Sequence, residues 1–215
     1  MSDELVFYTN PQSRGRTVRW MLEEVGQPYR TEILGYADSM KSAEYLAINP
    51  MGKVPAITHG GVVVTEAGAI CAYLADAFPQ AGLAPPLGYP RRGPYFRWMF
   101  FAAGPLEAAV TDKRLGVVVP PEQRPMVGYG NFEDAIDVAE QALKAGDYIL
   151  GDAFSAADVY FGSAIGFFLQ FGAIEPRPSF TAYVQRLQSR PAAIRAREID
   201  GALPTAQPQP EAQPA

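Results

Sequence analysis

Strand-like and helix-like patterns alternate over the first 80 residues of this 215-residue chain, and the chain beyond residue 94 carries only helical patterns. The apolar run at 4–8 is of β type, and Asn10-Pro11 ends it. Apolar residues then recur at helical spacing from Val18 to Val25, and Gly26 supplies a stop signal. This succession predicts an α/β domain followed by an all-helical one.

The remaining elements of the first region follow in the order strand, helix, strand, strand, helix. We place them at residues 29–34, 41–48, 54–58, 62–65 and 66–78. The last two strands flank His59-Gly60-Gly61, a short connection that favours a β-hairpin. The complete order, βαβαββα, is that of a thioredoxin-like domain, which we assign to residues 1–80.

A stretch rich in Pro and Gly separates the two halves, and we assign residues 81–94 to a linker. The all-helical domain is predicted over 95–203, with helices at 95–111, 122–144, 155–169, 179–189 and 192–199. Val117–Val119 is β-branched but directly precedes Pro120-Pro121, so we interpret it as a loop. Residues 204–215 lack apolar anchors and are predicted to form a disordered tail.

Charge and cysteine usage narrow the function classes. The net charge of -5 arises from 18 basic and 23 acidic residues spread along the chain, which leaves no basic stripe for nucleic acid. The N-terminus resembles no secretory signal and no apolar stretch is long enough to cross a membrane, so we expect a soluble, cytoplasmic protein. With Cys71 as its one cysteine, the chain has no CxxC motif, and any thiol chemistry requires a small-molecule thiol.

Two motifs carry a resemblance to a known family. Asn49-Pro50-Met51-Gly52-Lys53-Val54-Pro55-Ala56-Ile57 resembles the N-P-x-G-x-V-P-A-[LI] signature of cytosolic glutathione transferases, and Thr65-Glu66-Ala67-Gly68-Ala69-Ile70 is similar to that family's T-E-S-x-A-I segment. The resemblance extends over nearly the whole chain apart from the tail. It implies a detoxifying transferase that uses glutathione as co-substrate without a metal, acts on a small hydrophobic electrophile and forms a homodimer.

The resemblance also implies how glutathione binds. A cis bond at Pro55 would leave the backbone of Val54 free to pair with the cysteinyl backbone of the tripeptide. The γ-glutamyl end would dock at Glu66 and Ala67, where a helix begins and its free N–H groups favour a carboxylate. The family usually carries Ser at position 67, so Ala67 predicts weaker binding.

Two lysines, Lys41 and Lys53, are placed by the resemblance near the glycine carboxylate of glutathione. Several classes of the family have a His just before the first of these lysines, and this chain has Met40 there. The ordinary alternative for both lysines is a solvated surface position. We therefore treat both lysines as candidate binding residues.

A hydroxyl donor in the loop after the first strand is needed to activate the thiol. A free thiol has a pKa of about 8.5, and lowering it by two units takes about 2.7 kcal/mol, which one hydrogen bond to the anion plus a helix N-terminus can supply. Ser13 is our first candidate, and a helix N-cap is its alternative role. Tyr8, which matches the tyrosine of other classes, and Asn10 remain rival candidates.

Other side chains receive structural interpretations. Ser155 and Asp158 form a predicted capping box at the start of a core helix, and Cys71 is predicted to be buried. The aromatic residues near 95–101 are expected to be mostly core, with part of that first helix lining a pocket for the electrophile.

Three functions stay open at this point. The first is transfer of glutathione to an electrophilic carbon, the second is glutathione-dependent reduction of disulfides or peroxides, and the third is a non-catalytic binding module. The intact Val54-Pro55 and Glu66 favour an enzyme, whereas Ala67 favours a module.

Overall fold

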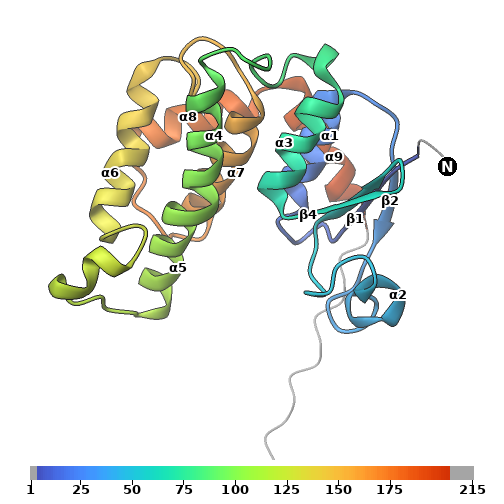
Figure 1. Cartoon of the computed structure of the whole chain (residues 1–215), viewed down its shortest axis with the longest axis horizontal. Helices are drawn as coiled ribbons and strands as arrows, with labels where there is room; N and C mark the ends of the chain where they lie inside the picture. Colours follow the sequence, from blue (N-terminus) through green and yellow to red (C-terminus); the bar gives the residue numbers. More distant parts are fainter. Residues whose placement is uncertain (1–3, 204–215) are drawn as a thin grey trace, which may run out of the picture.

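The computed structural model of the protein describes residues 4–203, so the predicted tail at 204–215 lies outside the described residues. Figure 1 shows a sheet flanked by helices on one side of the molecule and a helical bundle on the other. The predicted α/β domain followed by an all-helical domain is confirmed.

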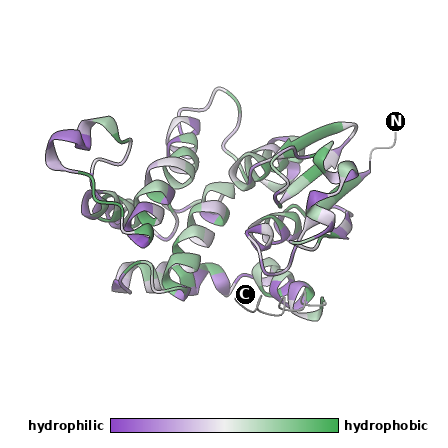
Figure 2. Cartoon of the chain, turned by 90° about the horizontal axis from the view of Figure 1, so that it is seen from below, coloured by the Kyte–Doolittle hydropathy of each residue, from purple (hydrophilic) through white to green (hydrophobic). Residues whose placement is uncertain are grey.

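Four strands form one mixed sheet in the order β2-β1-β3-β4. Their bounds are Leu5–Thr9 for β1, Arg30–Ile33 for β2, Ala56–His59 for β3 and Val62–Thr65 for β4. β1 pairs with β2 in parallel, whereas β1 with β3 and β3 with β4 are antiparallel. The thioredoxin-like topology predicted from the pattern is therefore present, and Figure 2 shows hydrophobic residues along part of the sheet.

Helices α1 (Gly15–Val25) and α3 (Ala67–Ala77) pack against the sheet. α1 ends as predicted at Gly26, whose φ of 70° lets its N–H donate to the carbonyl of Leu22. The helix predicted at 41–48 is shorter than expected. A 3₁₀ turn at Ser39–Lys41 comes first, and α2 (Ala43–Leu46) then starts because Ser42 accepts a hydrogen bond from the Tyr45 N–H.

The helical half contains α4 (Arg92–Phe101), α5 (Glu107–Leu115), α6 (Phe132–Ala142), α7 (Ala156–Gln170), α8 (Pro178–Gln188) and α9 (Pro191–Ala202). α4 starts inside the stretch that we assigned to the linker, and a π-helical segment containing Pro105 joins it to α5. Val117–Val119 lies outside helices and strands, as predicted.

The prediction of one continuous helix over 122–144 is wrong. Pro121–Met126 is a 3₁₀ segment with Pro125 inside it, and Gly130 adopts a φ of 67° before α6 begins. Asn131 then caps α6 by accepting a hydrogen bond from the Asp134 N–H. The missing backbone donor of proline and the left-handed glycine account for the break.

A single hydrophobic cluster runs through both halves of the molecule, from Leu5 on β1 to Ala196 on α9. α7 lies at its centre, with Phe161 and Ile165 fully buried. Figure 1 shows that α9, although last in sequence, lies beside α1. The chain thus closes back on its first domain and brings α7, α8 and α9 near the loop that follows β1.

Candidate active site

The pairing of the strands brings three segments to one edge of the sheet. Tyr8 is opposite Ala56, and Ala56 is opposite Thr65. The loop that follows β1, the residues that precede β3 and the start of α3 must therefore lie next to one another. These three segments contain most of the candidate residues predicted from sequence.

Hydrogen bonds of Asn10 fix the loop that follows β1. Asn10 is buried; its Nδ2 donates to the carbonyl of Leu34 at 2.8 Å, and its Oδ1 accepts from the Gln12 N–H at 2.9 Å. Both functional groups of this amide are therefore engaged within the protein. This geometry gives Asn10 a positioning role in the loop.

Ser13 lies half-buried at the mouth of α1. Its Oγ donates to the Asn10 carbonyl at 2.7 Å and accepts from the Gly15 N–H at 2.9 Å. Position 15 requires glycine because the chain lies close to Thr9, and an added Cβ would lie 1.9 Å from Thr9 Oγ1. The hydroxyl therefore binds the N–H of the first residue of α1, although Arg14 and not Ser13 is the N-cap of this helix, and it also lines a groove.

This groove, which we call the loop groove, has a volume of about 410 Å³. It is lined by Gln12, Ser13, Arg14, Tyr36, Met40, Lys41, Gly52, Lys53, Val54 and Phe167. The groove therefore brings together the predicted catalytic Ser13 and three of the predicted binding residues, Lys41, Lys53 and Val54.

The segment before β3 lines the loop groove and has backbone N–H and C=O groups available for hydrogen bonding. The Val54-Pro55 bond is cis, as the resemblance implied. Within residues 4–203, no backbone hydrogen bond engages the N–H or C=O of Val54. The carbonyl of Lys53 is instead held by the Asn49 Nδ2 at 2.8 Å and the Tyr45 hydroxyl at 2.6 Å.

Lys41 crosses the same segment and donates from Nζ to the Gly52 carbonyl at 2.9 Å. Gly52 has a φ of 57°, and an added Cβ would lie 2.8 Å from both Lys41 Nζ and the Met40 carbonyl. A side chain at position 52 would therefore displace the lysine. Lys53 is exposed.

Glu66 stands at the entry to α3 with φ 67° and ψ 120°, and it is the one non-glycine residue of positive φ in the described part of the chain. Such a conformation costs about 1–3 kcal/mol and is concentrated at binding sites. Ala67 is the first residue of α3, so its N–H belongs to the free donors of a helix N-terminus. Neither residue lines the loop groove itself, although the strand register places both beside Pro55.

Tyr8 does not line the loop groove. It lies half-buried on β1, and its ring packs 5.7 Å from that of Tyr45 within a small cluster that includes Met40 and Ala56. Tyr8 is therefore an aromatic residue of the strand that packs in this small cluster.

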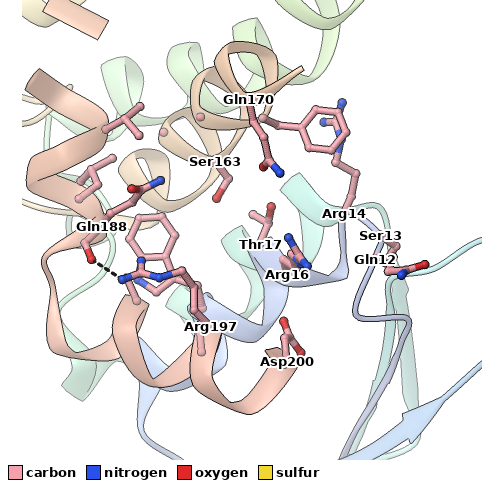
Figure 3. Close-up of a pocket in the computed structure, with 18 of the residues that line it drawn as sticks. Gln12, Ser13, Arg14, Arg16, Thr17, Ser163, Gln170, Gln188, Arg197 and Asp200 are labelled. Atoms are coloured by element: carbon pink, nitrogen blue, oxygen red, sulfur yellow. Dashed lines mark hydrogen bonds between the residues drawn. The ribbon is translucent and has the colours of Figure 1, made fainter. Parts of the chain in front are cut away.

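A second space, the interdomain cavity, has a volume of about 560 Å³ and opens between α1 and helices α7, α8 and α9 (Figure 3). It meets the loop groove at Ser13, Arg14 and Phe167, which line both. Arg14 donates to both oxygens of Glu107, at 2.9 and 3.1 Å, and stacks 4.2 Å above the ring of Phe167. Ser13 therefore lies where a molecule in the groove would face a molecule in the cavity.

The origin of the cavity walls differs from the sequence-based expectation. The first helix of the helical domain was expected to line the second pocket, but α4 and α5 contribute no lining residue to the groove or to the cavity. Tyr95, Trp98 and Met99 of α4 are buried in the core instead. Glu107 takes part only through its pairing with Arg14.

Sequence reasoning missed Tyr36, an exposed residue of the loop groove. Partial burial of its ring raises the pKa of the phenol, and the nearby Ser13 hydroxyl opposes that rise. The tyrosine has no motif in its neighbourhood, so only the folded structure places it beside the serine.

Two groups stand away from this edge. Cys71 is fully buried, and burial raises the pKa of its thiol well above the usual range. His59 contacts the Tyr73 hydroxyl through Nδ1 at 2.9 Å. Over residues 4–203, no group of three or more His, Cys, Asp or Glu side chains is arranged to hold a metal ion.

Comparison with known proteins agrees with this geometry. The model of the glutathione S-transferase N-terminal domain matches residues 13–77, and that of the C-terminal domain matches residues 107–186. Glutathione S-transferase A of Pleuronectes platessa is 30% identical over 187 residues, which cover 80% of each protein. The chain belongs to the glutathione S-transferase family of enzymes.

Solved structures support the same assignment. A glutathione transferase from Methylococcus capsulatus is 29% identical with a TM-score of 0.75, covering 93% of this chain and all of that one (100%). A glutathione transferase homologue from Sulfitobacter, solved with bound glutathione, is 26% identical with a TM-score of 0.75 and covers 94% and 100% of the two chains. No helix within residues 4–203 is long and apolar enough to span a membrane.

Proposed function

We propose that the enzyme binds glutathione in the loop groove, activates its thiol with the Ser13 hydroxyl and transfers it to a small hydrophobic electrophile in the interdomain cavity. The observation that carries this proposal is the junction of groove and cavity at Ser13. The glutathione sulfur forms a bond to the electrophilic carbon, the leaving group departs with its electron pair, and the thiol proton passes to solvent.

Three segments are proposed to hold the tripeptide. The unpaired N–H and C=O of Val54 form hydrogen bonds with the cysteinyl backbone of glutathione, as when a strand is added to a sheet edge. The N–H of Ala67 donates a hydrogen bond to the γ-glutamyl carboxylate, and the Glu66 carboxylate pairs with the ammonium group. Lys41 and Lys53, which also line the groove, are proposed to bind the glycine carboxylate.

Activation requires Ser13 to turn its proton from the Asn10 carbonyl toward the sulfur. The hydroxyl then still accepts from the Gly15 N–H, so the loop keeps one of its two hydrogen bonds. A hydrogen bond to a charged group contributes about 1.5–3 kcal/mol, and the start of α1 adds about 0.3–1 kcal/mol. Together these match the roughly 2.7 kcal/mol needed for a pKa two units lower.

The experiment compares wild type with Ser13→Ala, Tyr8→Phe and Asn10→Ala on a chlorinated dinitrobenzene. We expect Ser13→Ala to reduce kcat/KM about 10- to 100-fold, the loss of one hydrogen bond to an anion. Tyr8→Phe should have little effect, and Ser189→Ala, which removes an exposed hydroxyl that lines neither the groove nor the cavity, serves as the matched control. Full activity of Ser13→Ala would overturn the assignment of this residue.

A glutathione-capped disulfide tests the reductase alternative with the same variants. Turnover of the disulfide without turnover of the chlorinated substrate would replace transfer by reduction as the activity. Homodimer formation is a further proposal, tested by light scattering coupled to size-exclusion chromatography. A monomeric mass would contradict it.

A further inference from the structure

The arginines that line the interdomain cavity carry more positive charge than the carboxylates paired with them neutralise. Its charged lining residues are Arg14, Arg16, Arg197 and Asp200. Arg14 is paired with Glu107, and Asp200 accepts from the buried Arg19 at 3.0 Å. Both of these groups are therefore matched by an opposite charge, and two arginines remain.

Neither remaining arginine has a carboxylate partner within salt-bridge distance in the described part of the chain. Arg16 donates from Nε to the Pro11 carbonyl at 2.5 Å, and Arg197 donates from Nη2 to the Gln188 carbonyl at 3.0 Å. Each guanidinium has five N–H donors, so each retains donors for a ligand. Both side chains are exposed, so they can meet an incoming anion.

The remaining surface of the cavity is suited to an apolar body. Trp20, Phe167, Val184 and Leu187 line it. Figure 3 shows Arg16 on α1 and Arg197 on α9, with Ser163 and Gln170 of α7 across the opening from them. The volume of about 560 Å³ falls in the range of small-molecule sites.

We propose that the cavity selects second substrates in which an aromatic or other apolar electrophile carries a carboxylate, with Arg16 and Arg197 binding that carboxylate. This inference rests on the proposed function, because it assigns the electrophile to the cavity. The electrophilic carbon lies toward Ser13, and the anionic end lies toward α9. The protein as a whole has a net charge of -5, so the preference for an anion is local to this cavity.

The test uses a matched pair of electrophiles, 4-chloro-3,5-dinitrobenzoate and its neutral amide. In both, the glutathione sulfur bonds to the carbon that carries chlorine, chloride leaves with the bonding electrons, and the thiol proton goes to buffer. Each kcat/KM is divided by the rate constant of the uncatalysed reaction. We expect the carboxylate to be preferred by the wild type, with the preference shrinking as salt is raised.

Arg16→Gln and Arg197→Gln should each lower the ratio of carboxylate to amide about two- to fivefold, the range expected of one exposed charge pair. Arg91→Gln, which removes an exposed arginine at the start of α4, is the control and should leave the ratio unchanged. Equal use of both compounds by wild type, or ratios unaffected in both cavity variants, would overturn the proposal while leaving the proposed function intact.

Calorimetric titration of the two compounds in the absence of glutathione distinguishes a failure of the anion site from a failure of the proposed function. If neither compound is turned over, the proposed function fails. Tighter binding of the carboxylate, lost in Arg16→Gln and Arg197→Gln, would still support the anion site. Equal binding of both compounds would overturn it.

Discussion

At the scale of single residues, Ala67, where the family usually carries Ser, is predicted to weaken the binding of glutathione. Ala67 opens α3 with a free N–H but no hydroxyl. A serine there would add a second donor to the γ-glutamyl carboxylate in the proposed binding mode, and such a bond contributes about 1.5–3 kcal/mol.

Ala67→Ser should therefore lower the Kd for glutathione about tenfold or more, measured by isothermal titration calorimetry. Ala69→Ser, which adds a hydroxyl at an exposed position two residues further along α3, is the matched control. An unchanged Kd for Ala67→Ser would show that the carboxylate does not lie at this helix end.

The residues of the site were predictable to different degrees. Val54 and Glu66 belong to short motifs of fixed spacing, and Lys41 was placed by the resemblance to the family. Tyr36 and Asn49 were missed as site residues. Tyr36 lies beside Ser13 only once separate segments have folded together, whereas the bond from Asn49 to the Lys53 carbonyl is local and depends on the turn between them. A periodic pattern reports neither kind of contact.

At the scale of elements, the capping box that starts α7 is a folding device. Asp158 is buried and accepts from the N–H groups of Ile149 and Ser155 and from the hydroxyls of Ser155 and Tyr183, at 2.7–3.1 Å. The sequence predicted the box itself, and the structure adds the bonds to Ile149 and Tyr183.

Asp158→Ala should lower the free energy of unfolding by about 3 kcal/mol or more, since it leaves several buried donors without acceptors. Denaturant titration measures the loss, and Asp152→Ala, at an exposed aspartate in the preceding loop, controls for removal of a carboxylate. The activity of the remaining folded enzyme should be nearly unchanged, because Asp158 lines neither the groove nor the cavity. A stability equal to that of wild type would contradict the assigned role.

A buried ion pair lies in the contact between α1 and α9. Arg19 and Asp200 have side-chain exposures of 2% and 4%, and Arg19 also donates to Tyr29 and Thr31. Burial raises the pKa of Asp200, and the charge of Arg19 opposes that rise. The sequence pattern gave no sign of this pair, because its members are separated by most of the chain.

Asp200→Leu alone should cost about 3–5 kcal/mol of stability, because it leaves a buried guanidinium unpaired. The double variant Arg19→Met with Asp200→Leu should recover much of that loss, since no charge then remains buried. Arg195→Met, which breaks an exposed pair with Glu23, should cost less than about 1 kcal/mol. A double variant as unstable as the sum of its parts, measured by denaturant titration, would contradict this account.

At the scale of the whole molecule, the two halves share one core. The hydrophobic cluster includes Phe7 of the sheet together with Trp98 and Phe161 of the helical half. The composition predicted two domains and a linker, but it could not predict that α9 returns to α1 or that the interdomain cavity forms between them. Those features depend on residues more than 150 positions apart.

We therefore expect the protein to unfold in one cooperative transition, because separating the domains exposes the common core. Differential scanning calorimetry should give a single peak whose calorimetric and van't Hoff enthalpies agree. Two resolved transitions would show that the domains are independently stable.

In the proposed mechanism, Ser13 lowers the pKa of the thiol of bound glutathione. The most direct measurement is a pH titration of the thiolate's ultraviolet absorbance in the enzyme–glutathione complex, for wild type and for Ser13→Ala. We predict a thiol pKa about two units below the free value of about 8.5 in wild type, and a value near the free one in Ser13→Ala. An equally low pKa in both proteins would contradict the central claim.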